Sequence, residues 1–199
     1  MTSSATKPVV LVLTVLSHGL LPVPAKKTAL YTGNDPDSCT GVEGLVTSKG
    51  YPFEKHSVVT SDGYVIEMHR IPRGRDGCAS PCHGHPILLM SGLLGDSSNW
   101  VLDFPKQSLG FVLADRGYDV WMGNVRGSTY GKQHKSLQVQ SKEFWNFTFH
   151  EHAILDLPAQ IDYVLEFTGT KAVPYVGVSQ GTLIFFTMMS ERPEYNQKV

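Results

Sequence analysis

The sequence predicts an α/β protein whose mostly parallel sheet is covered by helices on both faces. Two observations predict this class. An alternating segment at residues 57–71 has the pattern of a β-hairpin, and from residue 86 onward strand-like and helix-like segments alternate. Such alternation is typical of parallel strands joined by helical crossovers. With 199 residues, 41% of them apolar, the chain also has enough material for a folded core.

The hairpin is the first predicted element. Residues 57–60 and 64–71 alternate between apolar and polar side chains, and Asp62-Gly63 between them favours a tight two-residue turn with positive φ angles. A stretch rich in Pro, Gly, Arg and Cys at 72–85 predicts a loop. The continuous apolar run at 86–90 then predicts a short buried strand.

Five further elements complete the alternation. Apolar residues recur every three or four positions in the helical segments, and short apolar runs mark the strands. The predicted elements are a helix at 104–116 that stops at Gly117, a strand at 118–122, a helix at 151–167, a strand at 172–177 and a buried helix at 182–190.

The first 25 residues have the pattern of a secretory signal peptide. One charge, Lys7, precedes the apolar run at 9–16, and small residues lead to an expected cleavage after Ala25. The run is interrupted well short of the roughly 20 apolar residues that a membrane span needs, so an uncleaved anchor is the weaker alternative. We therefore expect a signal peptide at 1–25, an extended lead-in at 26–49, no transmembrane anchor, and a secreted or lysosomal protein.

Net charge, cysteine count and one sequon bear on nucleic-acid binding, disulfide formation and glycosylation. The chain has 17 basic and 18 acidic residues, a net charge of -1, which offers no basic field to a nucleic acid. Cys39, Cys78 and Cys82 are an odd number, so one thiol is free or pairs with polypeptide outside these residues. The sequon at Asn146 predicts either N-glycosylation or an unmodified loop asparagine.

The motif that carries chemistry is Gly177-Val178-Ser179-Gln180-Gly181, a G-x-S-x-G pattern between a predicted strand and a predicted helix. In that context a sharp turn lifts the serine hydroxyl above the sheet, and a side chain at Gly177 or Gly181 would collide across the turn. The sequence therefore predicts Ser179 as a nucleophile. The alternative is a structural serine in a Gly-rich turn.

A tetrahedral oxyanion needs hydrogen-bond donors from two directions. The backbone N–H of Gln180 directly follows the nucleophile, and the helix that starts there adds a positive dipole end. The loop after the strand at 86–90 contains Gly92, which allows close approach, so we assign the Leu93 N–H as the second donor. A plain turn between strand and helix is the alternative for that loop.

Many spaced blocks along the chain, in order, match one known family. They are Gly50-Tyr51-Pro52, Asp62-Gly63-Tyr64, Arg70-Ile71-Pro72, Gly92-Leu93-Leu94, Ser98-Asn99-Trp100, Asp119-Val120-Trp121, Gly123-Asn124, Arg126-Gly127, Phe144-Trp145, Asp156-Leu157-Pro158-Ala159 and residues 177–181. From about Gly50 to Val199 the chain resembles the acid lipases of the α/β-hydrolase fold, which include lysosomal acid lipase and gastric lipase.

The resemblance implies an acid-tolerant carboxylic ester hydrolase that acts on triacylglycerols or cholesteryl esters at a lipid–water interface. It implies Ser179 as nucleophile, Leu93 and Gln180 as the oxyanion-hole donors, and no cofactor. Two positions depart from the family, which usually has His where this chain has Ser91 and Val178. We expect altered oxyanion-hole geometry or specificity there, since neither lost imidazole is the base.

The remaining catalytic groups are expected elsewhere. A serine needs an imidazole base and an orienting carboxylate, in the chain order Ser, then Asp or Glu, then His. The twenty residues after Ser179 contain Glu191 and Glu194 but no Asp or His, and all eight His precede it. We therefore expect the Asp and His beyond residue 199, which makes residues 50–199 the N-terminal part of a lipase domain truncated after the nucleophile helix. The alternative is a non-catalytic lipid-binding product or pseudoenzyme.

Three other features receive structural interpretations. Asp156 precedes the nucleophile strand, and Arg126 lies in a Gly-rich loop, so we expect both to support the scaffold. The spacing from Cys78 to His85 resembles a zinc cluster, but thiols in a secreted, Pro/Gly-rich loop more often pair or stay free. We therefore expect no metal.

Overall fold

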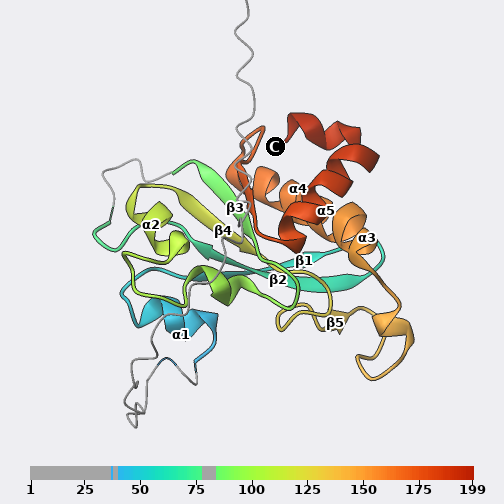
Figure 1. Ribbon diagram of the computed structural model, residues 1–199. Helices are drawn as coiled ribbons and strands as arrows, with labels where there is room; N and C mark the ends of the chain where they lie inside the picture. Colours follow the sequence, from blue (N-terminus) through green and yellow to red (C-terminus); the bar gives the residue numbers. More distant parts are fainter. Residues whose placement is uncertain (1–36, 38–39, 78–83) are drawn as a thin grey trace, which may run out of the picture.

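The computed structural model describes residue 37, residues 40–77 and residues 84–199 (Figure 1). The expected signal peptide and its cleavage after Ala25 lie outside the described residues. So do Cys39, Cys78 and Cys82, and with them most of the cysteine-rich loop.

Six strands form one mixed sheet that confirms the predicted fold class. Its path runs β1-β2-β4-β3-β6, and β5 pairs with β2. The strands are β1 (Glu54–Val59), β2 (Tyr64–Ile71), β3 (Pro86–Met90), β4 (Asp119–Gly123), β5 (Gln133–His134) and β6 (Tyr175–Gly177). β4, β3 and β6 are parallel, and the opening pair β1 and β2 is antiparallel. The parallel strands are those predicted from residue 86 onward, and β6 leads directly to the G-x-S-x-G motif.

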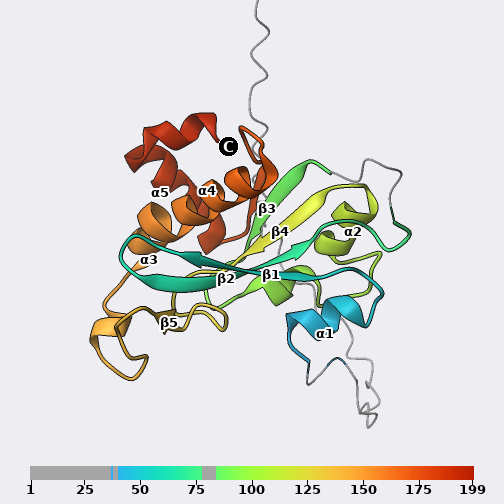
Figure 2. The ribbon, with the colours of Figure 1, turned by 180° about the vertical axis from the view of Figure 1, so that it is seen from behind.

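Helices cover both faces of this sheet (Figures 1 and 2). One face carries α1 (Val42–Thr47), the 3-10 turn η1 (Ser97–Trp100) and α2 (Leu109–Asp115). The other carries α3 (Phe149–Glu151), the π-helix η3 (His152–Asp156), α4 (Leu157–Thr168), α5 (Gln180–Glu191) and the 3-10 turn η4 (Pro193–Gln197), whose Tyr195 joins their core. The 3-10 turn η2 (Glu143–Trp145) belongs to neither core. Alternate side chains of β3 point to opposite sides, as the period of two in a strand requires. Leu88 and Met90 join the core under α4 and α5, whereas Ile87 and Leu89 join the core under α2.

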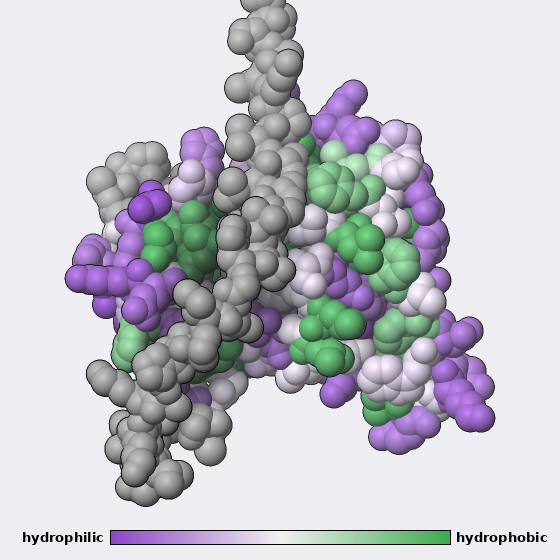
Figure 3. Space-filling view, in the orientation of Figure 1, coloured by the Kyte–Doolittle hydropathy of each residue, from purple (hydrophilic) through white to green (hydrophobic). Residues whose placement is uncertain are grey.

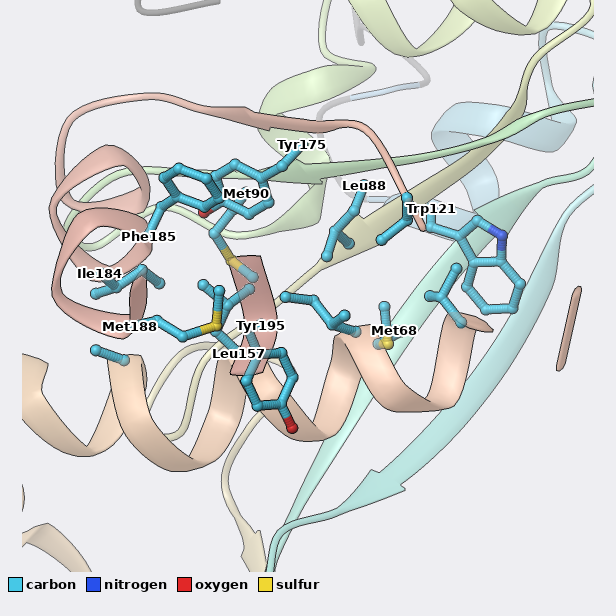
Figure 4. Packing of buried hydrophobic residues seen from close by; sticks show 14 of the residues in the cluster. Met68, Leu88, Met90, Trp121, Leu157, Tyr175, Ile184, Phe185, Met188 and Tyr195 are labelled. Atoms are coloured by element: carbon cyan, nitrogen blue, oxygen red, sulfur yellow. The ribbon is translucent and has the colours of Figure 1, made fainter. Parts of the chain in front are cut away.

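The core under α5 fixes that helix against the sheet (Figure 4). The rings of Tyr175 in β6 and Phe185 in α5 stack with centroids 4.7 Å apart. Ile184 and Met188, one and two turns into the helix, are buried beside them. Each such side chain contributes about 1.5–3 kcal/mol when fully buried, so the strand and helix that flank Ser179 are held firmly.

The lead-in predicted to be extended contains a helix. α1 spans Val42–Thr47, and Val42, Leu45 and Val46 are buried on one side of it. Their spacing of three and four positions is helical, but six residues are too few to show a period against a polar, Gly-rich background. The prediction for this stretch was therefore wrong.

The hairpin is confirmed, but its turn differs from the predicted two-residue form. Thr60 donates from its amide to the Tyr64 carbonyl, so three residues rather than two form the connection. Of these, Gly63 alone has a positive φ, 103°. Glycine supplies the required left-handed conformation at the end of the turn, as in three-residue hairpin loops.

Two helical segments have irregular beginnings. The helix predicted from residue 104 begins only at Leu109. Phe104 precedes a proline and is disfavoured in helical conformation, and Ser108, the N-cap, is extended at φ -74° and ψ 124°. Further along, Pro158 has no N–H to donate to the carbonyl of Ile154, and the helix is of π type just before it. That carbonyl instead accepts a hydrogen bond from the Arg192 guanidinium at 2.9 Å.

Candidate active site

Ser179 occupies a strained turn between β6 and α5. Its φ of 54° and ψ of -118° lie outside the regions that L-residues ordinarily adopt, and its side chain is exposed. Such a conformation costs of the order of 1–3 kcal/mol and persists only where the surroundings enforce it. The turn presents the Ser179 hydroxyl at the surface, at the end of a parallel strand.

Two glycines allow this turn to pack against β3. A Cβ on Gly181 would lie 2.4 Å from the Met90 carbonyl oxygen, and a Cβ on Gly177 would lie 2.8 Å from the carbonyl carbon of Gly181. The Val178 amide donates to the same Met90 carbonyl at 3.1 Å. The start of α5 therefore lies directly on the end of β3, with no room for a methyl group at either glycine.

The loop after β3, which we call the Gly92 loop (residues 91–97), lies beside Ser179. A Cβ on Gly92 would be 2.9 Å from the Ser179 Cβ and 3.4 Å from its Oγ. The loop closes on itself, since the Gly95 amide donates to the Gly92 carbonyl at 3.0 Å and Leu94 adopts a φ of 61°. Gly92 is thus the residue of this loop that lies directly against the serine.

The two amides assigned to the oxyanion hole come from two different segments. The Gln180 amide begins α5, where the first N–H groups of a helix have no intrahelical acceptor. The Leu93 amide belongs to the Gly92 loop. Neither amide donates a hydrogen bond to another group of the described residues. Donors of this kind suit an anion that forms at the serine.

The two positions that depart from the family pattern lie on either side of the serine. The Ser91 side chain is nearly buried, and its hydroxyl donates to the Asp96 carbonyl at 2.8 Å, which links the two ends of the Gly92 loop. Val178 is 39% exposed and lies next to Ser179. Ser91 therefore shapes the loop from inside, whereas Val178 contributes apolar surface.

The surroundings of the serine are open and apolar. Leu93 and Leu94 are 67% and 98% exposed, and Leu183 and Phe186 of α5 are about half exposed. Figure 3 shows apolar side chains on the surface formed by the helices of this face. In the part of the chain that the structure describes, no helix has the length and apolarity that a bilayer crossing requires.

The hydrogen bonds of the described histidines lead to groups other than Ser179. His56 bonds Tyr163 and Glu54, His69 bonds Ser97 and Glu67, and His134 bonds the loop around residue 136. No hydrogen bond joins a histidine of the described ranges to Ser179. No cluster of three metal-ligating side chains occurs within these same ranges.

Arg126 and Asp156, each expected from the sequence to support the scaffold, form a buried pair that the sequence did not predict. The Asp156 carboxylate accepts from the Arg126 amide at 2.9 Å and from its Nε at 2.7 Å. The same guanidinium donates twice to Asp62 in the hairpin turn and lies over the Tyr64 ring. Burial raises the pKa of Asp156 to about 6, although the Arg126 charge acts in the opposite direction.

Two shallow hollows lie elsewhere on the molecule. They have volumes of about 300 and 420 Å³ and lie beside Tyr130 and Glu67, between the hairpin, α1 and the loop before β5. Neither is lined by Ser179 or by the Gly92 loop.

Family models match most of the described chain. A partial α/β-hydrolase lipase region matches residues 42–104, and the α/β hydrolase fold matches residues 85–199. Mouse lipase member M is 47% identical over 165 residues, which cover 83% of this chain and 39% of the relative. Human lysosomal acid lipase/cholesteryl ester hydrolase is 45% identical over 168 residues, which cover 84% of this chain and 42% of the relative. The chain belongs to the acid lipase family of the α/β-hydrolase fold.

The chain spans about two fifths of the length of the curated relatives that it matches. The fold is also found in a Pyrococcus furiosus esterase of known structure, with a TM-score of 0.50 and 18% identity over 74% of this chain and 51% of that one.

A buried network behind the Gly92 loop was not predicted. His69, Ser97, Asn124 and Gln160 are all buried and joined by hydrogen bonds. These residues come from β2, η1, the end of β4 and α4, so only the strand register brings them together. The sequence shows only that these polar residues lie in or beside largely apolar segments. That pattern does not reveal which of them are hydrogen-bonded to each other.

Proposed function

We propose that this protein is a secreted or lysosomal serine hydrolase of neutral lipid esters, of the triacylglycerol or cholesteryl ester class. The observation that carries the proposal is the position of Ser179. It is an exposed serine at positive φ, between a parallel strand and a helix, with the Gly92 loop against its side chain. In an acid lipase this is the arrangement expected of a nucleophile.

The reaction would proceed by acyl transfer. The Ser179 Oγ attacks the ester carbonyl, its proton passes to an imidazole, and the amides of Leu93 and Gln180 stabilise the oxyanion. Collapse of this intermediate expels the alcohol with the proton from the imidazole, and water then hydrolyses the acyl-serine. No histidine of the described ranges is hydrogen-bonded to Ser179, so we propose that the imidazole and its carboxylate come from polypeptide beyond residue 199.

The exposed leucines, valine and phenylalanine around Ser179 suit an ester with long apolar chains, which would bury this surface on binding. The same surface supports the second candidate, a lipid-binding protein without catalysis. Secretion and an N-glycan at Asn146 complete the proposal. Asn146 is exposed and follows the 3-10 turn at Glu143–Trp145, so its side chain is accessible to a transferase.

Labelling with a p-nitrophenyl alkylphosphonate tests the nucleophile. Ser179 of the natural gene product should displace p-nitrophenol from the reagent and gain one phosphonyl group, which peptide mass spectrometry locates. Ser179→Ala should not be labelled, whereas Ser190→Ala, an exposed serine of the same helix, should react like the unmodified protein. Equal labelling of Ser179→Ala would contradict the assignment. A message that stops after Val199, together with an unlabelled Ser179, would favour the lipid-binding candidate.

A further inference from the structure

One histidine outside the proposed catalytic groups is connected to the Gly92 loop. His69 lies on β2, and neither it nor Ser97 has any solvent-exposed surface. Its Nδ1 lies 2.5 Å from the Ser97 Oγ, and its Nε2 lies 2.6 Å from a carboxylate oxygen of Glu67. The interaction with Ser97 thus joins the sheet to the last residue of the loop that approaches Ser179.

The hydrogen bonds around Ser97 assign the protons on this ring. Glu67 is a carboxylate and accepts, so the His69 Nε2 carries a hydrogen and donates to it. In the neutral ring Nδ1 is then an acceptor, and the Ser97 hydroxyl donates to it. The Ser97 oxygen in turn accepts from the Asn124 Nδ2 at 3.3 Å. Every polar atom of this set is satisfied by a neutral imidazole.

A protonated ring would disturb this arrangement, because Nδ1 would become a donor and the Ser97 hydroxyl would lose its acceptor. Burial lowers the pKa of His69, against the opposing effects of Glu67 on its own strand and Asp96 in the loop. Lys55 on β1 acts in the same direction as burial. The rings of Phe53 and Tyr130 contact the imidazole at centroid distances of 5.3 and 4.6 Å and complete its enclosure.

Further bonds carry this connection to both ends of the loop. The Ser97 amide donates to the Asn124 Oδ1 at 2.8 Å, and the Asn124 Nδ2 donates to the Glu67 carbonyl at 2.7 Å. The Asp96 carbonyl, one residue before Ser97, accepts from the Ser91 hydroxyl. The loop is therefore closed at its base, and the base is fixed to β2 and to the end of β4.

We propose that His69 is a positioning residue for the oxyanion hole, acting through its hydrogen bond with Ser97 on the loop that carries the Leu93 amide. This deepens the proposed function and rests on it. A histidine that merely fills the core would stabilise all parts of the fold to the same extent. A positioning histidine holds the Gly92 loop in particular, and its effect depends on the acceptor at Nδ1.

Hydrogen–deuterium exchange of the folded gene product distinguishes the two roles. His69→Leu leaves the Ser97 hydroxyl without an acceptor, and the two hydrogen-bonded amides of the loop, Gly95 and Ser97, should exchange at least about tenfold faster, as expected when a buried hydrogen bond is lost. His69→Asn places an amide oxygen where Nδ1 was, so it should keep exchange near the original rate. Ser97→Ala, which removes the same bond from the other side, should behave like His69→Leu and replaces it as the test if His69→Leu does not fold.

His56→Gln is the matched control, because His56 also has two ring partners but packs against α4. It should leave exchange of residues 91–97 unchanged. Unchanged loop exchange in His69→Leu and Ser97→Ala, or an equal increase in His56→Gln or His69→Asn, would overturn the proposal. Phosphonate labelling of Ser179 in His69→Leu should also slow. If the unmodified protein is not labelled at all, the proposed function fails while the exchange result still decides the role of His69.

Discussion

Single residues at the proposed site differ in how well the sequence reveals them. Ser179 was predictable, because glycines must stand where a Cβ would collide, and that requirement leaves the G-x-S-x-G pattern in the sequence. Gly92 was predictable for the same reason. The bond between His69 and Ser97 was not, since their separation of 28 residues carries no local signal and their contact depends on the packing of η1 against β2.

His152 is a buried histidine without a hydrogen-bond partner, and it should limit stability in acid. It is 6% exposed, both ring nitrogens are unbonded within the described residues, and burial and the Arg126 charge lower its pKa to about 4. The unfolded chain binds this proton near pH 6.5, so stability falls as the pH drops from about 6.5 to about 4. His152→Met should raise the free energy of unfolding by about 1 kcal/mol at pH 7 and by about 2–3 kcal/mol more at pH 4.5.

Urea unfolding at both pH values measures these changes. His150→Gln provides the control, because His150 lies two residues earlier with its side chain 41% exposed. Its effect should stay below about 0.5 kcal/mol at either pH. A gain for His152→Met that is the same at pH 7 and pH 4.5 would contradict the assigned protonation.

At the scale of elements, the sequence predicted which segments are strands and helices better than where they end. β3 begins and ends at the predicted residues, since its five consecutive apolar side chains are all buried between two helical layers. α2 is shorter than predicted, because residues 105–108 are Pro-Lys-Gln-Ser, which do not extend the apolar pattern, and Ser108 is extended at the N-cap. β5 was missed altogether, since two residues are too few to show alternation.

The contact between α5 and β3 should depend on Gly181. A methyl group there would meet two backbone oxygens, at 2.4 Å from Met90 and 2.8 Å from Ser91, which cannot move without shifting the end of the strand. Gly181→Ala should therefore lower the free energy of unfolding by at least about 3 kcal/mol. Urea denaturation followed by circular dichroism measures this loss.

Gly169→Ala separates steric collision from backbone strain. Gly169 ends α4 at a φ of 69°, and nothing lies within 4 Å of the position that its Cβ would occupy. Its substitution should cost only the left-handed conformation, about 1–2 kcal/mol. If the two variants lose equal stability, close packing of α5 on β3 is not what requires glycine at 181.

For the molecule as a whole, the response to acid is a sum of opposing contributions. The pKa of Asp156 is raised from 3.8 to about 6, so the folded state binds this proton first and gains stability as the pH falls from about 6 to about 4. His152 has the opposite sign over nearly the same range. The two contributions to the free energy of unfolding therefore largely offset each other between about pH 6 and pH 4.

Arg126 connects distant parts of the chain, so its removal should lower the free energy of unfolding of the whole fold. It is 2% exposed and joins the hairpin turn through Asp62 to the π-helix η3 through Asp156. Arg126→Met should cost about 3–5 kcal/mol at pH 8, because it leaves the Asp156 carboxylate buried without its cation. Without that cation the Asp156 pKa should rise further, so the carboxyl is neutral at pH 5 and the loss should shrink by at least about 1 kcal/mol there.

Arg75→Met is the control. The Arg75 side chain is 40% exposed and its guanidinium lies 3.8 Å from the Asp115 carboxylate, so this variant should cost below about 1 kcal/mol at both pH values. Urea titrations at pH 8 and pH 5 compare the variants, and a loss for Arg126→Met that does not change with pH would mean that packing, rather than the ion pair with Asp156, is what Arg126 provides.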